Sequence, residues 1–137
     1  MDRLLIDCNI LIDWLKDRLP YSEPAGRLLA MVESNIVKGY VSPLTLSNTY
    51  YILRKHSNKR IADQFLKDVK DLFDILDMTK EITLSAIKNR YKDFEDDLHY
   101  QTAIKNRIDY IITRNQSDFL KDKIQVVTAE AYLELKR

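Results

Sequence analysis

The sequence predicts a single α/β domain over residues 1–137, in which helices flank a central parallel sheet of about five strands. Short apolar runs of strand length alternate along the chain with longer segments of helical periodicity. The runs are continuous in Leu, Ile and Val, as in strands that are covered on both faces. Only two glycines and three prolines interrupt the 137 residues, and neither a repeat nor a low-complexity linker marks a domain boundary.

The expected strands are RLLIDC (3–8), GYVS (39–42), LFDILDM (72–78), DYIIT (109–113) and IQVVT (124–128). A helix is expected directly after the first strand, and further helices at 22–38, 43–56, 59–71, 79–91, 93–107 and 129–136. Ser42 followed by Pro43 is typical of a helix start, with a hydroxyl cap and proline in the first helical position. Strands that alternate with helices form right-handed βαβ units.

Composition excludes several classes of protein. The 22 basic and 21 acidic residues leave a net charge of +1, so nucleic acid could be bound only through a local patch. The basic run RKHSNKR (54–60) could hold a phosphate backbone, although such a run is often only a solvated loop.

A single cysteine, Cys8, excludes an internal disulfide framework. No apolar run approaches the ~18 residues of a membrane span, and the start does not resemble a signal peptide. We expect a cytoplasmic protein that binds no membrane.

Ligands of parallel α/β sheets bind beyond the carboxyl ends of the strands. The residues expected there are Asp7, Ser42, Asp77, Thr113 and Thr128. Asp7 is the most suggestive, because it stands between two apolar runs. Its carboxylate either caps the next helix or faces a site.

Four carboxylates, Asp93, Glu95, Asp96 and Asp97, occupy five positions at the start of a helical segment. Acids in a first turn are stabilised by the helix dipole, by roughly 0.3–1 kcal/mol each. On a helical wheel, however, Asp96 and Asp97 border the apolar face, whereas Glu95 points the opposite way. A carboxylate on a buried face needs a cation or a fixed donor. His99 falls on the polar face and is expected to be solvated.

Other polar side chains are expected at the same edge. Asn48 has apolar neighbours one turn away on each side, so its amide either bonds to backbone or faces the site. The segment TRNQSDF brings Thr113, Asn115 and Asp118 to the end of the fourth strand. These residue types also form ordinary turns, and both interpretations remain open for Asp118.

Four segments together resemble a PIN domain, the fold of many small Mg²⁺-dependent ribonucleases, including VapC-type toxins. They are LLIDCNILID, VSPLTLSNTYYILRK, DFEDDLHYQTA and DYIITRNQSDF, and they occur in the order of the family. The resemblance implies that Asp7, Asp96 and Asp118 are catalytic and bind metal. It leaves Asn115 as an alternative to Asp118, and it places Asp97 and Thr113 beside the site.

One position departs from the family pattern. Members usually carry Glu in the helix after the second strand, where this chain has Asn48. The resemblance counts this position as catalytic, and a neutral amide there puts strong nuclease activity in doubt. Asp oxygens suit Mg²⁺ or Mn²⁺, and the absence of Cys/His clusters argues against zinc. Such a metal could activate a water molecule for phosphodiester cleavage.

The function implied is a metal-dependent endoribonuclease, with RNA as substrate and an antitoxin protein as a possible partner. One alternative is a PIN-like domain that binds RNA or a partner with little catalysis. A second is a phospho-receiver domain, in which Asp7, Asp77 and Thr113 fit loosely. Family resemblance and the apolar residues of the first two helices suggest a homodimer, with Trp14 as its anchor; these residues are Ile10, Leu11, Trp14, Leu28, Leu29, Met31 and Val32.

Overall fold

The computed structural model describes residues 1–120 and 122–137 and contains a five-stranded sheet in the order β3-β2-β1-β4-β5. Every pair of neighbouring strands is parallel. The strands are β1 (Arg3–Ile6), β2 (Lys38–Val41), β3 (Asp74–Ile75), β4 (Tyr110–Ile112) and β5 (Gln125–Val127). Each lies inside an expected strand or begins one residue before it, so the predicted fold class is confirmed.

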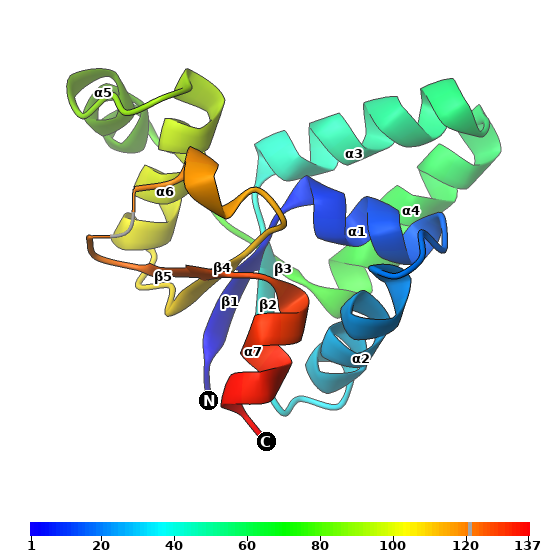
Figure 1. Cartoon of the computed structure of the whole chain (residues 1–137). Helices are drawn as coiled ribbons and strands as arrows, with labels where there is room; N and C mark the ends of the chain where they lie inside the picture. The colour runs from blue at the N-terminus through cyan, green and yellow to red at the C-terminus, as the bar shows by residue number, and fades with distance from the viewer. Residues whose placement is uncertain (121) are drawn as a thin grey trace.

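Helices fill the intervals between the strands (Figure 1). They are α1 (Cys8–Leu15), α2 (Ser22–Glu33), α3 (Pro43–His56), α4 (Lys59–Leu72), α5 (Lys80–Lys88), α6 (Phe94–Lys105), the 3-10 helix η1 (Gln116–Asp118) and α7 (Ala129–Leu135). Many of these helices begin at a residue whose side chain caps them. At the start of α3, Ser42 directly precedes Pro43, and its hydroxyl accepts a hydrogen bond from the backbone N–H of Thr45 at 3.1 Å. Across the described residues, no helix combines the length and the apolar character that a bilayer crossing requires.

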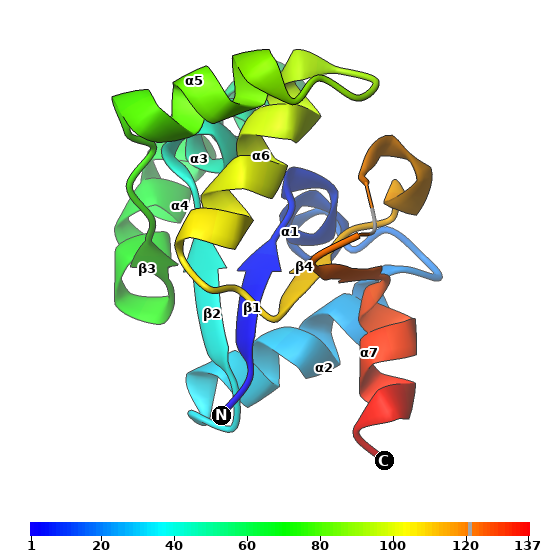
Figure 2. The same ribbon diagram turned by 90° about the vertical axis from the view of Figure 1, so that its left-hand side faces the viewer.

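The side chains of β1 point alternately to the two faces of the sheet. Leu4 and Ile6 join the core that α1, α2, α3, α4 and α7 cover, whereas Leu5 joins a second core under α6. Figures 1 and 2 show these layers, with α5 and α6 on the opposite side of the sheet from α1, α2, α3, α4 and α7. The interior of the sheet is therefore buried on both faces, as the continuous apolar runs predicted, whereas both residues of the edge strand β3 are exposed.

The connections diverge at β1. From β1 the chain passes to β2 and β3 on one side, and then returns through α5 and α6 to β4 on the other side of β1. The order of connections thus reverses between β1 and β4, which pair directly through Leu4–Tyr110, Leu5–Ile111 and Ile6–Ile112. A crevice beyond the carboxyl ends of two such strands is the usual ligand site of an open α/β sheet. Asp7 and Thr113 are the residues that follow these two strands.

The same topology argues against a receiver domain. The receiver sheet has the order 2-1-3-4-5, with its third strand in the interior. Here β3 lies at the edge of the sheet, and Asp77 beyond it is exposed. Asp77 is thus far in sheet order from the reversal between β1 and β4.

Most of the apolar residues expected at a dimer interface belong to the core instead. Of the seven, Ile10, Leu11, Leu28, Leu29 and Val32 are buried between α1, α2 and the sheet. Trp14 remains 41% exposed and packs beside Gly26 of α2, where an added Cβ would lie 3.6 Å from the indole Cδ1. The homodimer remains a prediction, with Trp14 as its main support.

Candidate active site

Asp7 and Thr113 meet where β1 and β4 end. The Thr113 hydroxyl donates a hydrogen bond to Asp7 Oδ2 at 2.7 Å, and the backbone N–H of Cys8 donates to Asp7 Oδ1 at 2.8 Å. Asp7 is therefore the N-cap of α1, as the simpler interpretation proposed. The same carboxylate also lines a cavity at this edge of the sheet.

Asn9 and Arg114 complete this corner, and sequence reasoning missed the role of both. The Asn9 amide donates to Thr113 Oγ1 at 3.2 Å, and its oxygen accepts from the backbone N–H of Arg114 at 3.1 Å. The Arg114 guanidinium forms two hydrogen bonds to the fully buried carboxylate of Asp13, at 2.7 and 3.0 Å. These contacts fix the chain after β4 against α1. The spacing of Asn9, two residues after Asp7, was the only available signal.

The acids at the start of α6 point in different directions. Asp93 caps the helix by accepting from the backbone N–H of Asp96 at 3.3 Å. Asp96 lines the cavity that Asp7 lines, as predicted. Asp97 was expected at the rim of the site, but it is buried away from the cavity. There it accepts a hydrogen bond from Arg90 Nε at 2.9 Å and from the backbone N–H of Tyr91.

The wheel also misplaced Glu95. It was expected to point away from the site, yet it lines the cavity and accepts a 2.6 Å hydrogen bond from Asn48 Nδ2. Asn48 lies in α3 and lines the cavity from the other side. Of the two interpretations that the sequence left open for Asn48, the structure supports the one that faces the site.

His99 is a further correction. It was expected to be solvated, but it is 4% exposed, and its Nδ1 lies 3.4 Å from Ser42 Oγ. Burial lowers the pKa of the imidazole below its usual value, against the opposing influence of Asp7 and Glu95. The helical wheel assumed that α6 buries a single apolar face. The helix packs against more than the sheet, so polar side chains such as Thr102 are buried as well.

The cavity has a volume of about 280 Å³, and residues of α1, α3 and α6 and of the segment after β4 line it. Its lining residues are Asp7, Cys8, Asn9, Ile12, Arg18, Asn48, Ile52, Glu95, Asp96 and Asn115. Of the two candidates in the TRNQSDF segment, Asn115 lines the cavity, whereas Asp118 lies at the end of η1 outside this lining. The charge of Asp118 nevertheless acts on Asp96.

Asp96 is the carboxyl group that its surroundings perturb most clearly. Burial is the main cause, followed by the negative charges of Asp93, Asp118, Asp7 and Glu95, and together they raise its pKa to about 7. At neutral pH the carboxyl group is therefore partly protonated. A cation among these acids would favour the ionised form.

The donors around the cavity fit a hard divalent cation in their chemistry. Carboxylate oxygens of Asp7, Glu95 and Asp96 and amide oxygens of Asn48 and Asn115 suit Mg²⁺ or Mn²⁺. In the 136 described residues, however, no three Asp, Glu, His or Cys side chains are grouped closely enough to hold a metal as they stand. The acids would thus have to draw together around a cation.

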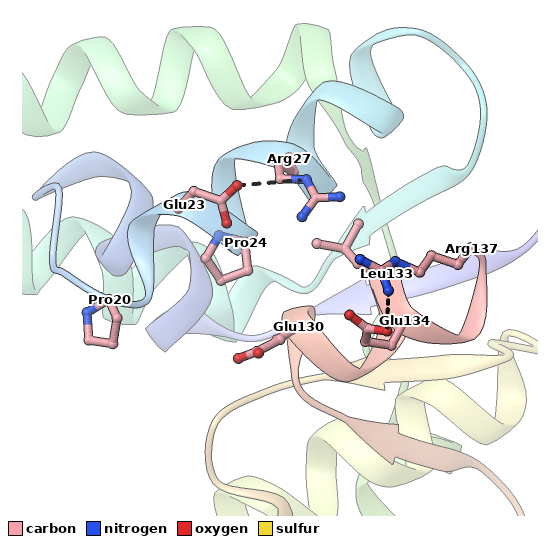
Figure 3. A pocket seen from close by; sticks show the side chains of 8 residues that line it. All are labelled: Pro20, Glu23, Pro24, Arg27, Glu130, Leu133, Glu134 and Arg137. Atoms are coloured by element: carbon pink, nitrogen blue, oxygen red, sulfur yellow. Dashed lines mark ion pairs between the residues drawn. The ribbon is translucent and has the colours of Figure 1, made fainter.

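A second cavity, between α2 and α7, offers no comparable chemistry (Figure 3). Two of its three acids are already paired: Glu23 with Arg27 at 3.7 Å and Glu134 with Arg137 at 3.5 Å. None of the predicted site residues lines it.

Known proteins resemble this chain over nearly its whole length. Ribonuclease VapC1 of Aquifex aeolicus is 27% identical over 144 residues, which cover 97% of this chain and 94% of that protein. Among solved structures, a toxin–antitoxin complex from Klebsiella pneumoniae is 26% identical, with a TM-score of 0.69 over 92% of this chain and 97% of that one. VapC20 of Mycobacterium tuberculosis, a toxin that cleaves the sarcin-ricin loop, has the same TM-score at 15% identity, over 87% and 98% of the two chains, and shows a shared fold. The PIN domain family matches residues 3–117, which is most of the chain, and this protein belongs to that family.

Proposed function

We propose that this protein is a metal-dependent endoribonuclease and the toxin of a toxin–antitoxin pair. One observation carries the proposal: Asp7 and Asp96, 89 positions apart in the sequence, line the same cavity at the point where the sheet connections reverse. The name of the Aquifex relative, a ribonuclease, supports the same activity.

The cation would be Mg²⁺ or Mn²⁺. Asp7 and Asp96 would hold it, Asp118 would approach from η1, and the amide oxygens of Asn48 and Asn115 are further candidate ligands. A bound divalent ion lowers the pKa of a water molecule and stabilises the oxygen that leaves during phosphodiester cleavage.

Hydrogen bonds within the chain orient the carboxylate of Asp7. Thr113 and the N–H of Cys8 hold the two oxygens of Asp7, so that carboxylate cannot rotate freely. Asn9 holds the Thr113 hydroxyl in turn. His99 is not placed as a general base, because its ring is buried against Ser42.

RNA would approach over basic side chains. Arg18 lines the cavity. The basic run 54–60 begins two residues after Ile52, which also lines the cavity, and continues from α3 into α4. All its residues are exposed except the half-buried Ser57. Such residues neutralise phosphates without reading sequence. Because the net charge is near zero, this attraction would have to come from such a local patch.

The antitoxin partner is proposed from the similarity to the Klebsiella toxin–antitoxin complex, to which 92% of this chain aligns.

A homodimer is proposed from the exposed Trp14 on α1. Light scattering at high concentration tests the dimer. A monomer there, or a dimer that survives Trp14→Arg unchanged, would contradict the role of Trp14.

RNA cleavage tests the proposed function. We expect the wild-type protein to cleave RNA with Mn²⁺ or Mg²⁺, to be inactive with a chelator, and to lose at least about a hundredfold in rate on Asp7→Asn. Glu81→Gln, an exposed first-turn acid of α5, is the control and should retain activity. RNA that binds without being cleaved under any metal condition would instead support the binding-domain alternative.

A further inference from the structure

The departure at Asn48 has a counterpart across the cavity. The family pattern carries a glutamate on α3, and this chain has an amide there. Directly opposite, on α6, stands Glu95, and the two side chains join through a 2.6 Å hydrogen bond. A carboxylate is therefore present beside the place where the family pattern would put one, but it comes from a different helix.

The chemistry of the contact fixes its direction. An ionised carboxylate only accepts hydrogen bonds, so the Asn48 NH₂ group faces Glu95. A glutamate at position 48 would instead place a second negative charge against Glu95, which costs energy. Asn48 and Glu95 thus fit together as a pair, whereas two glutamates would not.

Glu95 differs from the other acids of its turn in what surrounds it. Asp97 is buried against Arg90, and Asp93 caps the helix. Glu95 has neither role: it is exposed, it lines the cavity with Asp7 and Asp96, and its contact is a neutral amide. Its charge therefore acts on the cavity, where the described lining residues include one arginine, Arg18, and no lysine.

We propose that Glu95 supplies from α6 the metal-binding carboxylate that the family pattern places on α3, and that Asn48 positions it. This inference rests on the proposed function, because the group that Glu95 would help to hold is the divalent cation of the ribonuclease. The site then keeps its full complement of carboxylates, and Asn48 does not mark a weakened enzyme.

Titration of Mn²⁺ into the protein tests the inference independently of activity. We expect Glu95→Gln, which preserves the size of the side chain, to weaken Mn²⁺ binding at least about tenfold. The matched control is Glu81→Gln, which changes the same residue type in the exposed first turn of the neighbouring α5 and should bind as the wild type does. Because both sites are exposed, neither change should shift the metal-free Tm appreciably.

Moving the charge back provides the second part of the test. The double variant Asn48→Glu/Glu95→Gln restores a carboxylate on α3 and should recover most of the lost affinity. Asn48→Glu alone should tighten Mn²⁺ binding by less than about tenfold, because Glu95 already supplies the carboxylate at this place. Asn48→Ala should weaken binding by a smaller factor than Glu95→Gln, because it leaves Glu95 present but unrestrained.

The outcomes separate this inference from the proposed function. If the wild type binds Mn²⁺ and cleaves RNA while Glu95→Gln does both equally well, the role of Glu95 is refuted and the ribonuclease stands. A tenfold gain in affinity from Asn48→Glu alone would also refute it, because the α3 position would then be an empty ligand site. If the wild type neither binds Mn²⁺ nor cleaves RNA, both proposals fail together.

Discussion

Asp7 combines two roles in one side chain. One oxygen caps α1 through the Cys8 N–H, and the other accepts the Thr113 hydroxyl from the end of β4. The cap fixes where α1 begins. The hydrogen bond from Thr113 connects the end of β1 to the end of the neighbouring strand β4, at the edge where ligands bind in such sheets. The cap and the site interpretations of this residue are therefore compatible.

Thr113→Val removes the hydroxyl while preserving the shape of the buried side chain. Asp7 loses a donor, and the N–H of Asn115, which donates to the same hydroxyl at 3.0 Å, loses its acceptor. We expect the free energy of unfolding to fall by about 1–3 kcal/mol in urea titrations with a chelator present. Thr83→Val, whose hydroxyl bonds to Thr79 O on the surface of α5, should cost less than about 0.5 kcal/mol. Equal losses at both positions would show that the Thr113 contact has no special role.

Asp96 should make stability depend on pH. Its folded-state pKa is raised from 3.8 to about 7, so between these values the folded state holds a proton that the unfolded state has lost. The contribution of this group is therefore fully present below about pH 4 and is lost as the pH rises through 7. In chelator, Asp96→Asn should thus gain stability relative to the wild type from pH 4 to pH 8. A flat difference between the two curves would contradict the raised pKa of Asp96.

At the scale of elements, the segment after β4 is held to α1 by a buried ion pair. Asp13 is fully buried and Arg114 forms two hydrogen bonds to it, while the Arg114 guanidinium also stacks 4.1 Å from the Tyr21 ring centre. This pair anchors the backbone that carries Thr113 and Asn115 to the site. Burial of a charge is tolerated here because the guanidinium matches the carboxylate at both oxygens.

Breaking this pair should destabilise the protein strongly. Arg114→Met leaves the Asp13 carboxylate without its main partner, and we expect a loss of about 3–5 kcal/mol in the free energy of unfolding. Asp13→Asn combined with Arg114→Met removes both charges and should recover part of that loss. Arg27→Met breaks the exposed pair with Glu23 that Figure 3 shows and should cost less than about 1 kcal/mol. If Arg114→Met costs no more than Arg27→Met, the anchoring role is wrong.

The helix α6 shows where prediction from the sequence ends. The wheel placed Asp96 correctly, because that acid borders the apolar face that packs on the sheet. It misplaced Glu95 and His99, because the Asn48 side chain and the start of α3 contact α6 from another direction. Contacts between two helices depend on how they pack across the sheet edge, and the periodicity of one helix does not contain that information.

At the scale of the whole molecule, the strands were predictable and their order was not. Continuous apolar runs mark the interior strands β1 and β4, since both faces of the sheet are buried there. The order β3-β2-β1-β4-β5 depends on the direction in which each connection turns, which local sequence does not specify. Likewise the contact between Asp13 and Arg114 joins residues 101 positions apart. The site could be predicted where residues follow strands, and could not where side chains meet across helices.

A single titration addresses the central claim that the carboxylates of Asp7, after β1, and of Asp96, on α6, gather around a divalent cation. Mn²⁺ is titrated by calorimetry at pH 7 into the wild type and Asp96→Asn, in two buffers of different ionisation enthalpy. We predict that the wild type binds with release of protons, since the partly protonated Asp96 must ionise to bind metal. Asp96→Asn should bind at least about tenfold more weakly and release fewer protons. The account is contradicted if the wild type shows no saturable binding at millimolar Mn²⁺, or if Asp96→Asn binds as tightly and releases as many protons.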